Sequence, residues 1–356
     1  MKQILFFAAS FLLLFAPECL AQDKKDENPE GWKIGGGIGF DFSQLLLINP
    51  KIGAGENRIG VGANSNFYGN YQKGRLTWKN SANLNFVIQK LGKDPNRPFQ
   101  KSLDELRLSS TVLYNLTAEN PLAYALDVLA VTQITPTYQG NFLSPQSTGR
   151  QYAIAKFFAP ATITVSPGMA YKPDAHLSVL LSPASLKVIA VPDDSIAMQG
   201  NAGLTNSIHG NPLGRFASEQ AFRQSYGVRP SGKINDSTYF ANNFIQLGAT
   251  LKVTYQNKFL KDKEGKARLG ISSTLSLYSN YLRDPQNIDV EWITQADLYI
   301  FKGLSLTATG NLFYDHDILM QVDRDGDLNT GVNGYESTGR RVSFVQTLLL
   351  KYNFLF

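Results

Sequence analysis

The sequence predicts an all-β protein, a single-domain transmembrane antiparallel β-barrel of about 12 strands. Three observations indicate this fold class. Apolar and polar residues alternate with a period of two along most of the chain, in runs of ~10 residues. Charged residues make up 18% of the chain, below the ~25% typical of globular domains, and aromatic residues make up 12%. The chain also ends on an apolar, aromatic strand face.

The N-terminal residues predict export. Lys2 precedes a largely apolar run, Ile4–Ala16, which has the length of a secretory signal and is too short to cross a bilayer as a helix. The small residue Ala21 precedes Gln22 at a suitable cleavage site. Residues 1–21 are therefore predicted to be a signal peptide.

The rest of the chain is predicted to be a periplasmic lead-in, residues 22–31, followed by the outer-membrane barrel, residues 32–356. The lead-in is charged and contains few apolar side chains that could be buried in a core. Cys19 is the only cysteine and lies in the predicted signal, so the mature chain has no disulfide. Its stability must then come from a closed hydrogen-bonded sheet or from lipid.

Each predicted strand has one apolar face. In the first strand, Ile34, Ile38 and Phe40 alternate with Lys33 and Asp41. Alternation of this kind is typical of strands with one apolar and one polar face. The predicted strands are residues 33–43, 59–67, 77–89, 105–116, 122–135, 161–171, 177–191, 245–256, 268–281, 288–300, 304–315 and 342–356.

Two features of the strands and their connections refine this prediction. Pro167 and Pro183 lie inside two of the runs, which predicts bulged or irregular strands there. The connections alternate in length, with short turns after the second, fourth, sixth, eighth and tenth strands and mostly long segments after the third, fifth, seventh and eleventh. Transmembrane barrels have short periplasmic turns and long outer loops. An even number of strands then places both ends of the barrel on the periplasmic side.

The last strand resembles the assembly signal of Gram-negative outer-membrane barrels. Tyr352, Phe354 and Phe356 share one face, and the chain ends on an aromatic residue. This resemblance implies recognition by the barrel-assembly machinery during insertion. The alternative is the last strand of a secreted β-sandwich, whose strands also alternate.

The alternation predicts which side chains face lipid and which face the lumen. The apolar set is expected to contact outer-membrane lipid. Six bases and seven acids fall on the opposite face, and such near-balance favours pairing across a closed or plugged lumen over an open ion-selective pore. These predicted lumen charges are Lys33, Asp41, Lys79, Glu105, Arg107, Asp127, Lys252, Arg268, Asp289, Glu291, Asp297, Asp315 and Lys351.

Several short stretches combine aromatic, polar and turn residues in a recurring way. They include Phe42–Ser43–Gln44, Asn70–Tyr71–Gln72–Lys73–Gly74, Trp78–Lys79–Asn80, Tyr171–Lys172–Pro173 and Tyr314–Asp315–His316–Asp317. These stretches resemble an uncharacterised family of Gram-negative outer-membrane proteins, known only as a domain of unknown function. The resemblance implies a β-barrel in the cell outer membrane, and it implies no known activity or catalytic residues.

Motifs of the common enzyme classes are missing from the sequence. The chain has three histidines, His176, His209 and His316, and contains no His-Glu-x-x-His, no Gly-x-Ser-x-Gly and no phosphate loop. Asp315 and Asp317 flank His316, but on one strand the two acids share a face and the histidine points the other way. We therefore predict that the protein is not an enzyme.

One acidic loop suggests a calcium site. Asp323, Asp325, Asp327 and Asn329 alternate around a glycine, a spacing that lets one turn direct several oxygens at a single hard cation. An EF-hand loop would need glycine and glutamate where Leu328 and Gly334 stand. A solvated acidic loop is the favoured interpretation, and no other cofactor is expected.

Charge and loop composition limit the function. The formal net charge is +5 without a cluster of Lys and Arg, so nucleic acid is not an expected partner. The sequence favours an outer-membrane barrel that binds or passes a small ligand through a largely plugged lumen. The alternatives are a structural or assembly subunit of an envelope complex and, third, an outer-membrane hydrolase. Residues 192–241, rich in glycine and aromatics, are expected to fold inward as a plug or outward as a docking surface for an envelope protein.

Overall fold

The computed structural model describes residues 30–45, 58–91, 98–117, 120–146, 151–200, 207–262, 265–301, 303–318, 320–322 and 337–355. Twelve strands in these ranges form one antiparallel barrel, and the predicted fold class is confirmed. The barrel strands are β1 (Gly31–Leu45), β2 (Arg58–Lys73), β3 (Leu76–Leu91), β4 (Gln100–Asn115), β5 (Leu122–Thr132), β6 (Ala161–Tyr171), β7 (Leu177–Ala190), β11 (Asn243–Lys261), β12 (Ala267–Asn280), β13 (Ile288–Phe301), β14 (Leu304–Tyr314) and β17 (Ser343–Leu355).

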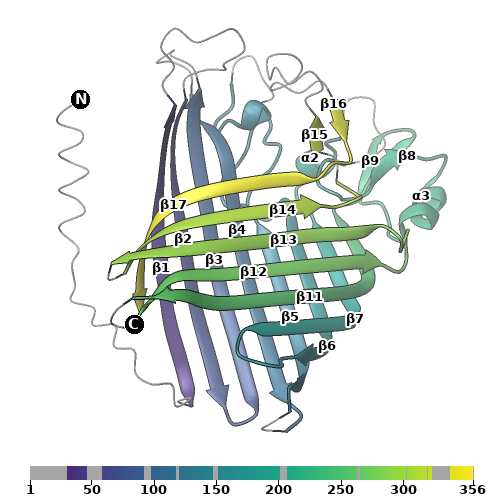
Figure 1. Ribbon diagram of the computed structural model, residues 1–356. Helices are drawn as coiled ribbons and strands as arrows, with labels where there is room; N and C mark the ends of the chain where they lie inside the picture. Colours follow the sequence, from purple (N-terminus) through teal and green to yellow (C-terminus); the bar gives the residue numbers. More distant parts are fainter. Residues whose placement is uncertain are drawn as a thin grey trace.

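Strands that follow one another in the chain are neighbours in the barrel, and β1 pairs with β17 to close it. The closing pair runs from Gly35 opposite Leu355 to Phe40 opposite Leu350. In Figure 1 the strands of the N-terminal wall run along the barrel behind the strands of the C-terminal wall, which cross them at a large angle. This pair joins the two ends of the sheet into a barrel, as a membrane-spanning sheet requires.

Strand β7 contains the irregularity that its proline predicts. Pairing with β11 shifts between Ser182 and Ser185, and pairing with β6 shifts between Leu181 and Leu186, so β7 has one residue more than either neighbour there. Proline has no N–H for the ladder, so a bulge is the place where a strand accepts it. The extra residue reverses the face of every later residue of β7. Leu180 therefore faces the lumen before the bulge, and Lys187 faces it afterwards.

A small folded unit occupies part of the segment between β7 and β11. It consists of α2 (Asp194–Ala197), β8 (Leu213–Arg215), α3 (Glu219–Tyr226), β9 (Gly232–Asn235) and β10 (Thr238–Phe240), and we call it the outer module. The three strands pair in the order β8, β10, β9. The sequence predicted a loop here, because each of these elements is too short to show a periodic pattern.

The outer module has its own core. Phe222 of α3 is fully buried and packs against Phe216, Tyr226 and Tyr239, with ring centroids 5.0 to 6.0 Å away. Helix α3 begins where the side chain of Ser218 accepts a hydrogen bond from the backbone of Ala221, 3.2 Å away. Figure 1 places the module at the end of the barrel where β15 (Met320–Val322) and β16 (Ser337–Gly339) form a hairpin and where the 3-10 helix η1 (Gln139–Asn141) lies.

None of the helices in the described ranges is long and apolar enough to cross a membrane.

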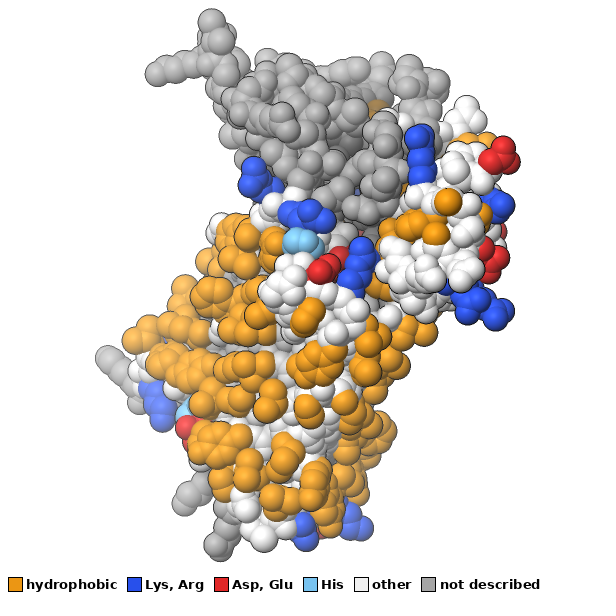
Figure 2. Space-filling model, turned by 90° about the vertical axis from the view of Figure 1, so that its right-hand side faces the viewer, with side chains coloured by type: hydrophobic (Ala, Val, Ile, Leu, Met, Phe, Trp, Pro, Cys, Tyr) orange, Lys and Arg blue, Asp and Glu red, His pale blue; other side chains and the backbone are white. Residues whose placement is uncertain are grey.

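The outside of the barrel wall is apolar. Hydrophobic side chains cover the wall in Figure 2, whereas charged side chains gather at its two ends and on the outer module. Phe40 is 67% exposed and Leu181 is 54% exposed on this face. Exposed aromatic side chains lie toward the strand ends, among them Trp78 and Tyr114 near the short turns and Tyr281 at the other end. An apolar band with aromatic residues at its borders is the outer surface of a transmembrane barrel.

Candidate functional site

Small polar side chains line part of the lumen, and ion pairs cross it. Alternation along β2 and β3 turns asparagines inward, where Asn64 hydrogen bonds to Asn85 and Asn66 to Asn83. Such amide pairs satisfy polar groups away from bulk water. Short connections lie at one end of the barrel, which is the periplasmic end, and the long connections lie at the outer end.

The first crossing contact joins Arg107 of β4 to Glu291 of β13. The guanidinium donates to both carboxylate oxygens of Glu291, with Nη1 to Oε2 at 2.9 Å, and its Nε lies 3.4 Å from Oε1 of Glu105. The strands β4 and β13 are not neighbours in the barrel, so the pair spans the lumen. A bidentate contact of this kind is the strongest form of an arginine–carboxylate pair.

The second crossing contact joins Lys252 of β11 to Asp127 of β5. The ammonium lies 3.0 Å from both carboxylate oxygens, and the hydroxyl of Thr111 also donates to Asp127. Asp127 is 5% exposed. A carboxylate this buried needs its cation and its hydrogen bond, because an unpaired ion in such surroundings is very costly.

The third crossing contact lies near the outer end of the lumen. Lys187 of β7 donates to Asp289 of β13 at 2.9 Å and to Asp315 at 3.0 Å. Its ammonium also lies 5.2 Å from the centroid of the Tyr278 ring. Sequence reasoning missed Lys187, because alternation counted from the start of β7 places it outside. The signal that could have found it is Pro183, since the bulge there reverses the faces.

The predicted lumen acid Asp297 is also engaged. Asp297 accepts from Thr307 and from Gln295 Nε2, the latter at 2.8 Å. The predicted lumen base Arg268 instead lies at the periplasmic rim, where its Nε is 3.5 Å from Asp262 and its Nη1 donates to the Ile300 carbonyl. At the rim, Arg268 has a partner in the adjacent turn.

The remaining predicted residues are described to different extents. Lys79 lies in β3 and is exposed, and Lys33 of β1 makes a polar contact. Asp41 lies in β1, and Lys351, Tyr352 and Phe354 lie in β17, each without a described side chain. Two sets lie outside the described residues and remain predictions: the acidic loop residues Asp323, Asp325, Asp327 and Asn329, and the terminal Phe356.

The three histidines lie apart. His176 is in a periplasmic turn, where its Nδ1 lies 3.0 Å from the Gln256 carbonyl. His316 follows β14, and its Nδ1 lies 3.3 Å from the Tyr314 hydroxyl. His209 lies between α2 and β8 of the outer module, and its Nε2 lies 2.7 Å from the Ile154 carbonyl. Burial lowers the pKa of His209 to about 4, so this imidazole is neutral at pH 7 and donates that hydrogen bond.

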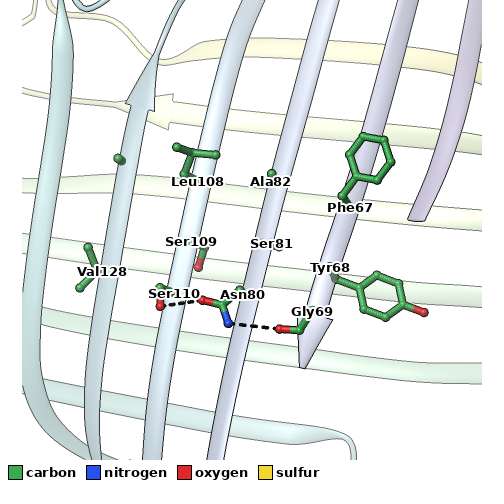
Figure 3. Close-up of a pocket in the computed structure, with 11 residues that line it drawn as sticks. Phe67, Tyr68, Gly69, Asn80, Ser81, Ala82, Leu108, Ser109, Ser110 and Val128 are labelled. Atoms are coloured by element: carbon green, nitrogen blue, oxygen red, sulfur yellow. Dashed lines mark hydrogen bonds between the residues drawn. The ribbon is translucent and has the colours of Figure 1, made fainter. Parts of the chain in front are cut away.

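A depression of about 400 Å³ lies on the wall across β2 to β5. Figure 3 shows Phe67, Leu108 and Val128 around it, with the hydrogen bonds from Ser110 to Asn80 and from Asn80 to the Gly69 carbonyl. Phe67 is 42% exposed and Leu108 is 45% exposed, because both point away from the lumen. The depression is thus a feature of the apolar outer face and is separate from the ion pairs.

A closed barrel of twelve antiparallel strands, apolar outside and polar inside, defines an outer-membrane β-barrel protein. Residues 42–138 match a family model described as "Protein of unknown function (DUF3078)". The resemblance to a family of unknown function that the sequence indicated is therefore confirmed for this stretch. No curated protein matches the chain.

Three solved structures are similar to the chain over most of its length. The COG4313 outer membrane channel from Pseudomonas putida F1 is 12% identical with a TM-score of 0.37, and the match covers 95% of this chain and 100% of that one. The translocator domain of the autotransporter NalP from Neisseria meningitidis is 8% identical with a TM-score of 0.35, covering 93% and 90%. A Pseudomonas aeruginosa FadL homologue is 9% identical with a TM-score of 0.28, covering 91% and 88%.

Proposed function

We propose that the protein binds or passes a small polar solute through a lumen that its own ion pairs narrow. The observation that carries this proposal is that charged side chains from strands on different sides of the barrel meet in its interior. Arg107 reaches Glu291, Lys252 reaches Asp127, and Lys187 reaches Asp289. Side chains of this length meet only where the lumen is narrow, so the passage they leave suits a small solute.

The outer mouth supports the same proposal. Phe244 and Ile189 are paired on the inward face of β11 and β7, and both are almost completely buried. The residue Gly210 lies against Ile189, so that a side chain added at Gly210 would come within 3.2 Å of it. The chain at Gly210 therefore covers part of the outer mouth and narrows entry to the lumen.

Two segments at the ends of the chain direct the protein to the outer membrane. Residues 1–21 direct export and are removed, residues 22–31 lead into the barrel, and residues 32–356 form it. The barrel-assembly machinery recognises Tyr352, Phe354 and Phe356 and inserts the barrel among outer-membrane lipids. The protein then acts without catalysis.

A second candidate function is a subunit that docks an envelope protein through its outer segments. The supporting observation is exposed aromatic surface in the long connection between β5 and β6. Tyr152 is 71% exposed and Phe157 is 57% exposed. Exposed aromatic side chains of this size are common in interaction surfaces.

One pair of experiments separates the two functions. Purified protein in a planar bilayer is expected to conduct small ions, and the double variant Arg107→Ala/Glu291→Ala is expected to conduct more because the crossing pair is gone. Removal of residues 200–232 is expected to raise conductance further if passage is the function. No conductance in any variant, together with loss of a co-purifying partner on that deletion, would favour the docking function.

A further inference from the structure

The depression in the outer wall lies across two rows of residues that the pairing of β2 to β5 aligns side by side (Figure 3). The row nearer the short periplasmic turns is Gly69, Asn80, Ser110 and Val128, and the next row is Phe67, Ala82, Leu108 and Ala130. A glycine and two alanines give this part of the wall little side-chain volume, whereas Phe67 and Leu108 project from it and are exposed. The volume of about 400 Å³ falls within the ~300–1,000 Å³ of small-molecule sites.

A chain of hydrogen bonds runs through the row nearer the turns. The indole of Trp78 donates to the Ser110 hydroxyl at 2.9 Å, and that hydroxyl donates to Oδ1 of Asn80 at 2.9 Å. Nδ2 of Asn80 donates to the Gly69 carbonyl at 3.2 Å. An amide nitrogen has two hydrogens, and this contact uses one of them. Because an outward-facing polar group inside a bilayer is costly without a partner, a lipid oxygen that accepts the second hydrogen would stabilise this arrangement.

Aromatic side chains lie on the periplasmic side of this row. Trp32 of β1 packs against Tyr71 and Trp78, with ring centroids 5.3 and 5.6 Å away. The Trp32 ring also borders the depression, because a side chain added at Gly69 would come within 3.6 Å of it. Both indoles are exposed. Indole rings at the border of an apolar band lie at the depth of the lipid headgroups. The depression therefore begins next to the headgroups of the periplasmic leaflet.

Arg75 adds a cation to this border. It lies in the turn between β2 and β3, and its guanidinium is 4.6 Å from the centroid of the exposed Tyr114 ring. Its Nε donates to the Asn115 carbonyl at 2.7 Å, and its Nη2 donates to the Leu116 carbonyl. These contacts hold the guanidinium at the outer surface of the rim, and they use only part of its five N–H groups. Tyr114 is four residues from Ser110 on the same face of β4, which is ~13 Å along the strand.

We propose that this face of β2 to β5 binds one phospholipid of the periplasmic leaflet, with its phosphate at Arg75, an ester carbonyl at Asn80 and an acyl chain in the depression. From the rim inward, the wall presents a cation, aromatic rings, hydrogen-bond donors and an apolar depression. A phospholipid presents an anion, ester groups and a hydrocarbon chain in the same order. The apolar wall of a second copy of this chain would cover the depression but would bring no anion to Arg75. Binding there does not depend on passage through the lumen.

Native mass spectrometry tests the site on the purified protein in a non-ionic detergent, titrated with palmitoyl-oleoyl phosphatidylglycerol. One saturable lipid adduct per barrel is expected for the wild type. Arg75→Gln is expected to weaken it at least ~10-fold, because a charge-assisted hydrogen bond to the phosphate is lost. Arg75→Lys keeps the cation and is expected to retain more binding than Arg75→Gln. Ala82→Phe is expected to weaken the adduct at least as much as Arg75→Gln, because the new ring fills the depression from the outer face.

Two matched controls lie on the other side of the barrel, in β12 and β13. Arg268→Gln removes another arginine of the periplasmic rim. Ala296→Phe enlarges an alanine four residues from the exposed Trp292 on the outer face of β13, as Ala82 is four residues from Trp78 on β3. Neither control is expected to change the binding of phosphatidylglycerol. Heat-modifiable gel mobility verifies that each variant is folded.

Three results would overturn the lipid site: no saturable adduct on the wild type, equal weakening in the controls, or weakening by only one of Arg75→Gln and Ala82→Phe. A protein dimer that Ala82→Phe abolishes, without a lipid adduct, would assign the depression to a second copy of the chain. An adduct that both variants weaken and both controls retain supports the site, whether or not the protein conducts.

Discussion

Nη1 of Arg107 lies 2.9 Å from Oε2 of Glu291, although 184 positions separate the two residues in the chain. The side chains retain 14% and 20% exposure, so the pair is mostly withdrawn from water. It ties β4 to β13 through the interior, independently of the hydrogen bonds of the wall. The barrel is therefore braced across its lumen as well as around its circumference.

Reversing the acid of this brace is expected to destabilise the barrel. Glu291→Lys places a second cation beside Arg107 and should lower the free energy of unfolding by about 2 to 4 kcal/mol, the cost of breaking a partly buried pair. The measurement is the urea midpoint of protein folded into lipid vesicles. The control Asp236→Lys changes an exposed acid of the outer module. Equal midpoints for the two variants would contradict a braced interior.

Removing the cation of the outer contact, Lys187, is expected to lower the free energy of unfolding more than the reversal of Glu291. Lys187→Met leaves Asp289 and Asp315 facing each other without their shared cation, and we expect a loss of ~3 to 5 kcal/mol in the same unfolding assay. Adding Asp289→Asn and Asp315→Asn should recover most of the loss, because neutral amides repel much less. The exposed lysine variant Lys73→Met serves as the control. If the added substitutions make the protein still less stable, charge repulsion is not the cause.

The outer module is expected to weaken in acid through His209. Its pKa is about 4 when folded and ~6.5 when unfolded, so between these values the unfolded state binds more protons. The stabilisation is therefore complete above pH 6.5 and is lost as the pH falls toward 4, by on the order of 3 kcal/mol. Hydrogen exchange of residues 207–241 at pH 7.5 and 4.5 measures this loss.

His209→Gln is the matched variant for that measurement, since glutamine can donate to the Ile154 carbonyl and does not titrate. Its exchange rates should change less between the two pH values than those of the wild type. The same change in both proteins would show that another group is responsible.

Deleting Phe356 is expected to reduce the amount of protein in the outer membrane, because the terminal aromatic residue resembles an assembly signal. The protein that fails to insert should be degraded or remain in the periplasm. Heat-modifiable gel mobility of the outer-membrane fraction measures the folded amount. Phe356→Tyr keeps the terminal ring and should insert normally. Unchanged levels after the deletion would count against the signal.

The sequence by itself determined the fold class and the positions of the barrel strands. A period of two depends only on local residues, and a sheet with one face in lipid and one in the lumen imposes it directly. The predicted range 161–171 coincides with β6, and the other predictions are off mainly at their ends. Pro183 likewise indicated the irregular strand where the structure has a bulge.

Only the tertiary structure decided which side chains meet in the lumen. Alternation predicts which face of its strand a residue occupies, but it does not indicate which strand lies across the barrel. The partners of Arg107 and Lys252 therefore could not be predicted from it. One extra residue in β7 turned Lys187 inward, a change of face that a count from the strand's start cannot contain. The outer module was missed because short elements are stabilised by packing, as around Phe222, and not by a periodic pattern. Contacts between distant residues depend on closure of the barrel, which is a property of the whole chain.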